Sequence, residues 1–240
     1  MTKYALLIVL FLNYSLLSAQ KSVKAAIVFE LFTSQGCSSC PPADKLLEEI
    51  KINYTNQNVY VLSYHVDYWN RLGWKDPFSN VSYSNYQSEY AKQFKSQSIY
   101  TPQLVVNGNE HYTGSNQVKV KQSLAKYQKN SKSNTSINIT DIKKTDTAVH
   151  FNYKVNGTNI NNTLFAIVVS KRSTKIYRGE NNNRTLDNHN IVANFRSSKQ
   201  EAGAISISIP NWITANDELN LISYTKDNSL KVTGATSIML

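Results

Sequence analysis

The sequence has 240 residues, and its 26 Lys and Arg against 16 Asp and Glu give a formal net charge of +10. The lysines are scattered, and the densest set, residues 118–132, fits the solvated face of an amphipathic helix. We therefore expect no nucleic-acid partner, although contact of this face with an anionic or membrane surface stays open.

The first 19 residues are predicted to be a secretory signal peptide. A lysine precedes an apolar run, and the small residues Ser18 and Ala19 mark a cleavage site. An uncleaved anchor is the alternative, but the cleanest apolar stretch, Ala5 to Leu12, is much shorter than the roughly 20 residues that span a bilayer. We expect an exported protein, periplasmic or secreted, without stable membrane insertion after cleavage, in surroundings where disulfides persist.

Residues 20–132 alternate strand and helix signals in the order β-α-β-α-β-β-α. In chain order we expect the strand 25–32, the helix 43–52, the strand 59–67, the helix 82–95, the strands 101–108 and 109–114, and the helix 115–130. Such alternation predicts a sheet with parallel members and helices packed on it. The Asn107-Gly108 pair predicts an antiparallel hairpin between the last two strands.

The pattern changes from about residue 133 onward. Short alternating or β-branched runs, separated by polar turns, predict strands with no helix between them. We expect residues 133–240 to form an all-β, immunoglobulin-like sandwich domain, following an α/β domain over residues 20–132.

Both cysteines of the chain stand where the first strand ends and the first helix begins, as Cys37-Ser-Ser-Cys40. The first turn of a helix has unpaired N–H groups and partial positive charge, which lower a thiol pKa and favour the reactive thiolate. This position predicts that Cys37 attacks a substrate disulfide and that Cys40, one turn along, resolves the mixed disulfide.

Two other interpretations of the cysteine pair stay open. As a purely structural link it is weak, because a four-residue loop contributes about 2 kcal/mol against about 4.7 kcal/mol for a 100-residue loop. As a metal site it would need further ligands, and His65 at the end of the neighbouring strand is the candidate. Two thiolates and this imidazole suit a soft ion such as copper.

Two further positions could serve the cysteines. Thr101-Pro102 opens the third strand, and a cis bond there would turn a backbone edge toward the cysteine loop, although an ordinary trans proline is the base-rate expectation. Glu30 lies in an apolar strand, where burial would raise its pKa and suit it to move a proton to or from Cys40. The alternative for Glu30 is a solvated position at a strand edge.

Taken together, four motifs resemble a family of exported bacterial proteins of unknown function, DUF1223, which is classed with the thioredoxin-like superfamily. They are ELFTSQGCSSCPPAD (30–44), HVDYWNRLGWKDPF (65–78), YTPQLVVNG (100–108) and RGENNNRTL (178–186). The resemblance implies a thioredoxin-like first domain, a catalytic role for Cys37 and Cys40, and a cis bond before Pro102. It implies no substrate.

Two of these segments depart from a plain thioredoxin. The loop 65–78 could form an aromatic and polar wall beside Cys37, or it could pack its tryptophans between the domains. The segment 178–186 is dense in polar groups, and we expect it to fold over the cleft. The Ser-Ser pair between the cysteines leaves the direction of electron flow open.

The sequence thus predicts an exported thiol–disulfide oxidoreductase that acts on protein or small-molecule thiols and disulfides. Cys37 is the nucleophile, Cys40 resolves, Thr101 and Pro102 position the substrate, and Glu30 or His65 moves a proton. No cofactor is required, because the electrons reside on the cysteines. The alternatives are a copper carrier that uses the same cysteines and a histidine, and a noncatalytic adaptor that binds through the sandwich.

Overall fold

The computed structural model describes residues 25–55, 57–129, 133 and 135–240. The first half contributes β1 (Ile27–Thr33), α1 (Pro41–Asn53), β2 (Val59–His65), the 3-10 helix η1 (Asn70–Leu72), α2 (Val81–Gln93), β3 (Gln103–Val106), β4 (Glu110–Thr113) and α3 (Gln117–Lys129). The second half contributes β5 (Ser136–Lys144), β6 (Ala148–Asn156), β7 (Asn162–Lys175), β8 (Thr185–Ser198), β9 (Ala202–Ser208), β10 (Leu219–Lys226) and β11 (Val232–Met239). Within these described residues, no helix is both long and apolar enough to span a membrane.

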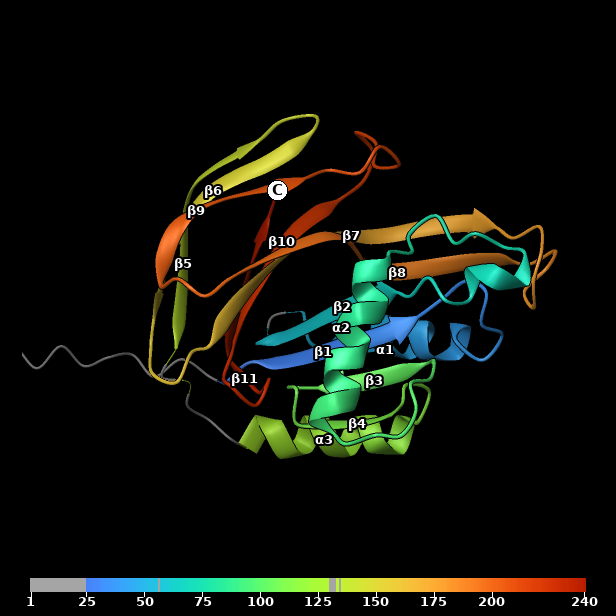
Figure 1. Cartoon of the computed structure of the whole chain (residues 1–240), viewed down its shortest axis with the longest axis horizontal. Coiled ribbons are helices and arrows are strands. Elements are labelled where there is room, and N and C mark those ends of the chain that lie inside the picture. Colours follow the sequence, from blue (N-terminus) through green and yellow to red (C-terminus); the bar gives the residue numbers. More distant parts are fainter. Residues whose placement is uncertain (1–24, 56, 130–132, 134) are drawn as a thin grey trace, which may run out of the picture.

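One sheet of eight strands runs through both halves of the chain, in the order β11-β10-β7-β8-β2-β1-β3-β4 (Figure 1). β1 and β2 are parallel, whereas β1 pairs with β3 and β7 pairs with β8 in antiparallel fashion. The two halves join where β8 runs parallel to β2, with Ile191 opposite Ser63. β5, β6 and β9 form a separate sheet of three strands.

The predicted fold class, a thioredoxin-like α/β domain followed by a separate immunoglobulin-like sandwich, is therefore wrong. Four strands of the second half continue the sheet of the first half, so the protein is mainly β and has one mixed sheet at its centre. The physical reason is the free edge of β2, whose N–H and C=O groups would stay unpaired in an isolated first half, and which β8 covers. The domain boundary near residue 132 adjoins residues 130–132 outside the described part and stays a prediction, and the signal peptide 1–19 also lies outside it.

The two faces of β1 meet different helices, and every residue of this strand is buried. Val28 and Phe32 pack with the tyrosines of α2 on one face, and Phe29 and Leu31 pack with α1 and α3 on the other. Figure 1 shows α2 crossing the near face of the sheet. A strand covered on both faces reads as a continuous apolar run, which is what residues 25–32 show.

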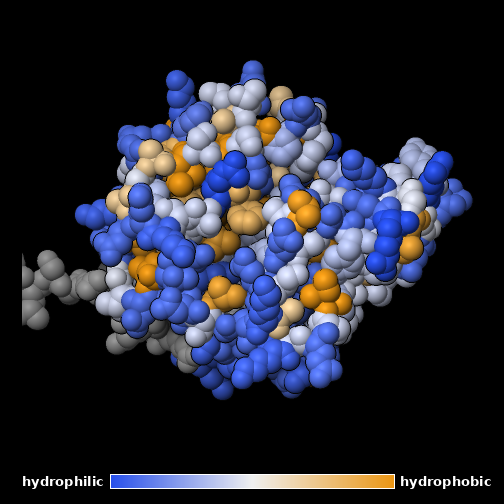
Figure 2. Space-filling model, viewed as in Figure 1, coloured by the Kyte–Doolittle hydropathy of each residue, from blue (hydrophilic) through white to orange (hydrophobic). Residues whose placement is uncertain are grey.

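A third core lies between the two sheets. Alternate residues of β6, from Val149 to Val155, pack against Phe165 and Ile167 of β7. The surface is polar by contrast: on the near face, apolar side chains show as separate spots among hydrophilic ones (Figure 2).

Candidate functional site

Cys37 and Cys40 form a disulfide between the end of β1 and the start of α1, with their Cα atoms 5.4 Å apart. The loop is a tight turn, because Cys37 N donates to Ser34 O at 3.1 Å and Cys40 N donates to Cys37 O at 3.3 Å. Both cysteines are fully buried, and only Ser38 and Ser39 between them are exposed. Cys37 Sγ lies 3.4 Å from Ser39 Oγ, so this hydroxyl can donate to the sulfur when it is a thiolate.

The first turn of α1 begins directly at the disulfide. Pro41 and Pro42 occupy its first positions, where proline is tolerated because the N–H groups would have no helical partner. Cys40 itself has helical dihedral angles, φ −77° and ψ −40°, and its carbonyl accepts from Ala43 N and Asp44 N. Cys40 therefore continues the geometry of the helix.

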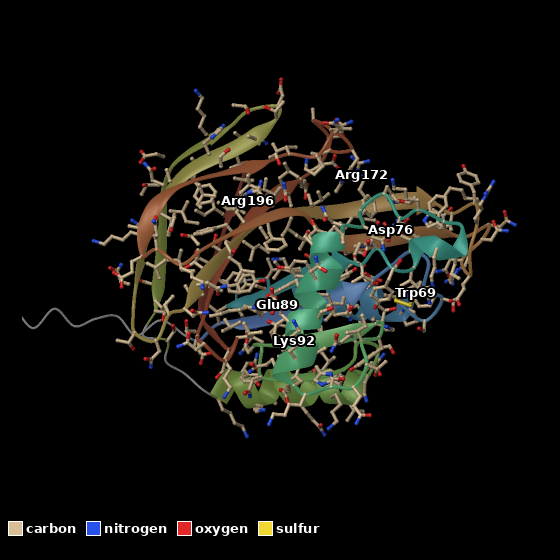
Figure 3. The ribbon with its side chains drawn as sticks, viewed as in Figure 1. Trp69, Asp76, Glu89, Lys92, Arg172 and Arg196 are labelled. Carbon is tan, nitrogen blue, oxygen red and sulfur yellow. A yellow bond between two sulfur atoms is a disulfide. The ribbon has the colours of Figure 1, made fainter. Side chains whose placement is uncertain are left out.

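The predicted substrate-positioning pair lies next to this loop. The Thr101–Pro102 peptide bond is cis. Trp69 Nε1 donates to Thr101 Oγ1 at 2.8 Å, and a Cβ added at Gly36 would lie 3.1 Å from Trp69 Cβ. Trp69 thus bridges the cysteine loop and Thr101, and Figure 3 shows the disulfide beside it. This contact supports the wall beside Cys37, whereas Trp74, which donates to Gln35 Oε1 and packs with Tyr177, lies between the two halves as the other interpretation expected.

The connection between β7 and β8 covers the cysteine loop. Asn181 is fully buried, and its Nδ2 donates to Gln35 O at 2.9 Å and to Cys37 O at 3.0 Å. Glu180 Oε2 accepts from Ser38 N at 2.9 Å, and this bond lowers the pKa of its carboxyl group. Residues 180 and 181 thus lie against the cysteine loop, as expected of the segment 178–186.

A polar group lies at the carboxyl ends of β1 and β2. Thr33 and His65 are paired residues of these neighbouring strands. Thr33 Oγ1 donates to Asp44 Oδ2 at 3.0 Å, and His65 Nδ1 contacts Asp76 Oδ2 at 2.7 Å. Since a carboxylate only accepts, Asp76 fixes the proton on Nδ1 of the imidazole. Gln35 N also donates to Asp76, at 2.8 Å, and ties the cysteine loop to this group.

Burial and neighbouring charges shift the pKa values of Asp44 and His65. It raises the pKa of Asp44 from 3.8 to about 6, with a smaller rise from Asp76 and opposing contributions from the His65 charge and the Thr33 hydrogen bond. Burial alone would lower the pKa of His65, but the charge and hydrogen bond of Asp76 and the charge of Asp44 raise it above 6.5. The site therefore contains His65, whose raised pKa favours the charged imidazolium, near Asp44, whose carboxyl group titrates at about pH 6.

The structure does not bring Glu30 to the cysteines. Its side chain lies on the α2 face of the sheet, whereas α1 covers the opposite face. Glu30 accepts from Tyr224 OH at 2.7 Å and from Tyr86 OH, and Lys226 Nζ lies 3.3 Å from its Oε1. The expected burial of Glu30 is confirmed and the solvated position at a strand edge is wrong. Its proton role toward Cys40 gains no support, because the side chain lies among phenols and Lys226 on the α2 face.

The copper alternative gains no support from the geometry. In the part of the chain that the structure describes, no group of three or more His, Cys, Asp or Glu side chains is arranged to hold a metal ion. His65 Nδ1 is committed to Asp76, and both sulfurs are committed to the disulfide.

Sequence reasoning missed Asp44, Asp76 and Asn181. A signal for Asp44 was available, because it falls on the buried face of α1 with Leu47, three positions on, and Cys40, four positions back. Asp76 and Asn181 belong to loops, where no periodicity marks a buried polar residue.

Comparison with known proteins adds a family and a fold. A family described as "Protein of unknown function (DUF1223)" matches residues 28–224. The X-ray crystal structure of a structural-genomics protein from Agrobacterium tumefaciens is similar over 92% of this chain and 96% of its own, with 25% identity and a TM-score of 0.63. A β-glucosidase from Kluyveromyces marxianus, in complex with glucose, matches 46% of this chain and 14% of its own at 12% identity, and its TM-score of 0.23 carries no argument. No curated protein matches the chain significantly.

Proposed function

Since the chain belongs to the DUF1223 family, which is described as proteins of unknown function, we propose from its site that it exchanges disulfides with thiols through Cys37 and Cys40. The match confirms the family resemblance drawn from the four motifs, whereas the thioredoxin-like superfamily is not confirmed. The observation that carries the proposal is the disulfide at the start of α1, enclosed by loops that contribute polar side chains. We further propose that the protein works outside the cytoplasm on protein or small-molecule thiols.

The exchange proceeds in two steps. In the reduced protein, the Cys37 thiolate attacks one sulfur of a substrate disulfide, forms a mixed disulfide and releases the other sulfur as a thiolate. The Cys40 thiolate then attacks Cys37 Sγ, restores the Cys37–Cys40 bond and releases the second substrate thiol. Two electrons pass from the protein to the substrate, and the reverse sequence oxidises a dithiol substrate.

The positions of the two sulfurs support this assignment of roles. Cys37 belongs to the loop with the exposed Ser38 and Ser39, and Ser39 Oγ is within reach of its sulfur. Cys40 is built into α1, and its carbonyl is bonded within the helix. The first attack therefore falls to Cys37, and Cys40 acts within the protein.

Because both sulfurs are buried, reaction with a bulky partner requires the β7–β8 connection to move. Its attachment to the cysteine loop consists of the Asn181 side-chain bonds and the Glu180–Ser38 bond. Hydrogen bonds of this kind contribute about 0.5–1.5 kcal/mol each, or somewhat more with a charged acceptor, so breaking them costs a few kcal/mol. The packing of Tyr177 with Trp74 adds to the cost of opening.

A pair of single-cysteine variants tests the proposal. Cys40→Ser should form a mixed disulfide with glutathione disulfide at Cys37, visible by mass spectrometry. Cys37→Ser should react far more slowly, because Cys40 is held at the start of α1 and does not adjoin the exposed serines as Cys37 does. The unaltered protein should titrate reversibly in glutathione buffers at a potential above roughly −300 mV. A lower potential, with both variants inert toward glutathione disulfide, would favour a structural bond and refute the proposal.

A further inference from the structure

Asp44 lies one helical turn after Cys40 on the same face of α1. Because Cys40 already has helical dihedral angles, the spacing of four residues places the two Cβ atoms about 5–6 Å apart. Asp44 N donates to Cys40 O at 3.2 Å, which fixes this turn. Both side chains are buried, so the first turn of α1 holds them on one face inside the protein.

One carboxylate oxygen of Asp44 accepts a hydrogen bond, and the other has no hydrogen-bond partner among the described residues. Oδ2 accepts from Thr33 Oγ1, while Oδ1 is buried and has no hydrogen-bond partner among the described residues. A buried carboxylate oxygen without a partner costs free energy and is uncommon in folded proteins. Such an oxygen is available to take up or release a proton.

A second polar atom without a partner lies on the neighbouring strand. His65 is opposite Thr33 in the register of β1 and β2, and adjacent strands are about 4.8 Å apart. Its Nδ1 is held by Asp76, while its Nε2 is buried and has no partner among the described residues. Thr33 thus links the two side chains: it donates to Asp44 and pairs with His65 across the sheet. Asp44 Oδ1 and His65 Nε2 each lack a hydrogen-bond partner among the described residues.

We propose that Asp44 takes the proton from the Cys40 thiol when Cys40 attacks the mixed disulfide, and returns it when the disulfide is reduced. The inference rests on the proposed exchange activity and adds its proton carrier. His65, oriented by Asp76, is a positioning residue whose charge favours the carboxylate form of Asp44. Glu30, the carboxylate that the sequence suggested for this role, is replaced by one on the helix itself.

The proton balance is complete without any further reactant. The Asp44 carboxylate accepts the proton of Cys40 S–H, the resulting thiolate attacks Cys37 Sγ, and the substrate sulfur leaves with the electron pair of the broken bond. In the opposite direction an external thiolate attacks Cys37, and Cys40 leaves as a thiolate that is protonated by the Asp44 carboxylic acid.

The charged groups that act on Asp44 come from elements next to α1. His65 on β2 and Asp76 in the following loop act on it directly. One turn further along α1, Glu48 Oε2 lies 3.0 Å from Nε2 of His189 on β8. A carboxyl group titrating near pH 6 in this setting is suited to exchange a proton with a thiol at neutral pH.

The decisive experiment is the pH profile of disulfide formation by the reduced full chain, with glutathione disulfide as the oxidant. The unaltered protein should show a rate that rises through an inflection near pH 6. Asp44→Asn should lose this inflection, react about tenfold or more slowly at pH 7, and accumulate the Cys37–glutathione mixed disulfide. Glu49→Gln, which removes an exposed carboxylate from the same helix, should behave like the unaltered protein.

A second variant keeps the carboxylate and moves its titration. Thr33→Val removes the hydrogen bond that lowers the pKa of Asp44, so the inflection should shift to higher pH. This result does not depend on how well Asp44→Asn folds, and a purely structural role for Asp44 would not produce it.

The outcomes separate the two proposals. If the unaltered protein exchanges disulfides and Asp44→Asn keeps its rate, its inflection and its low level of mixed disulfide, the proton role of Asp44 is refuted and the exchange activity stands. If the unaltered protein exchanges no disulfides at any pH, both the proposed function and the proton role of Asp44 are refuted.

Discussion

Replacing Asp44 with asparagine should stabilise the protein at neutral pH. The carboxyl group is fully buried, and burial raises its pKa from an ordinary 3.8 to about 6. The folded state therefore binds a proton more tightly than the unfolded chain does. It follows that the free energy of unfolding falls as the pH rises from about 4 to about 6 and stays reduced above that window.

The size of this effect follows from the pKa difference. At about 1.4 kcal/mol for each pKa unit, a rise from 3.8 to about 6 corresponds to about 3 kcal/mol of stability lost at pH 7. Asparagine keeps an oxygen to accept from Thr33 Oγ1 but carries no charge to bury. Asp44→Asn should recover up to about 3 kcal/mol at pH 7 and nothing below pH 4.

Urea unfolding of the disulfide-bonded protein between pH 4 and pH 8 measures this directly. Glu49→Gln, on the solvent side of α1, should change stability by less than about 0.5 kcal/mol across the range. If Asp44→Asn unfolds at the same or a lower urea concentration than the unaltered protein at pH 7, the buried carboxylate does not destabilise the folded state. Burial would then not raise the pKa of Asp44.

Three other variants probe the contacts around the site and the core. Lys226→Met leaves the buried Glu30 charge without its cation and should lower the free energy of unfolding in urea by about 3–5 kcal/mol. Adding Glu30→Gln should restore much of this loss, and a double variant that is equally unstable would contradict the pairing. Asn181→Ala removes both side-chain bonds to the cysteine loop and should speed reduction of the disulfide by dithiothreitol several-fold, whereas Asn182→Ala, at an exposed position, should not. Equal rates for the two variants would show that the β7–β8 connection does not limit access of dithiothreitol to the disulfide. Trp69→Phe removes the bond to the threonine before the cis proline and should cost about 1 kcal/mol in a thermal melt, and an unchanged melting temperature would show that the bond contributes nothing.

Individual elements could be predicted from the sequence because their signals are local. The apolar run 25–32 predicted the strand Ile27–Thr33, and the Asn107-Gly108 turn predicted the hairpin of β3 and β4. The place of the cysteines between strand and helix is equally local. The pairing of strand edges leaves no such local signal. β2 pairs with β8 through residues more than a hundred positions apart, and the residue pattern of neither strand indicates which strand lies beside it.

The error over Glu30 has the same origin. Alternation along β1 shows that Glu30 and Leu31 point to opposite faces. It does not show which face α1 will cover, because both faces of this strand are apolar and both are covered. The carboxylate assigned to the cysteines was therefore on the wrong side of the sheet, while Asp44 was already on the helix that carries Cys40.

The pairing of Glu30 with Lys226 has a consequence for how the chain is made. Glu30 lies in a central strand and leaves the ribosome early, but its cation follows 196 residues later. Until β10 is synthesised, a nascent chain that folded its first half would bury this carboxylate with the hydroxyls of Tyr86 and Tyr90 but without a counter-charge, which is unfavourable by several kcal/mol. We therefore expect the core around Glu30 to be completed only when β10 has been made, and a chain interrupted before that point to be more sensitive to proteases than the full chain.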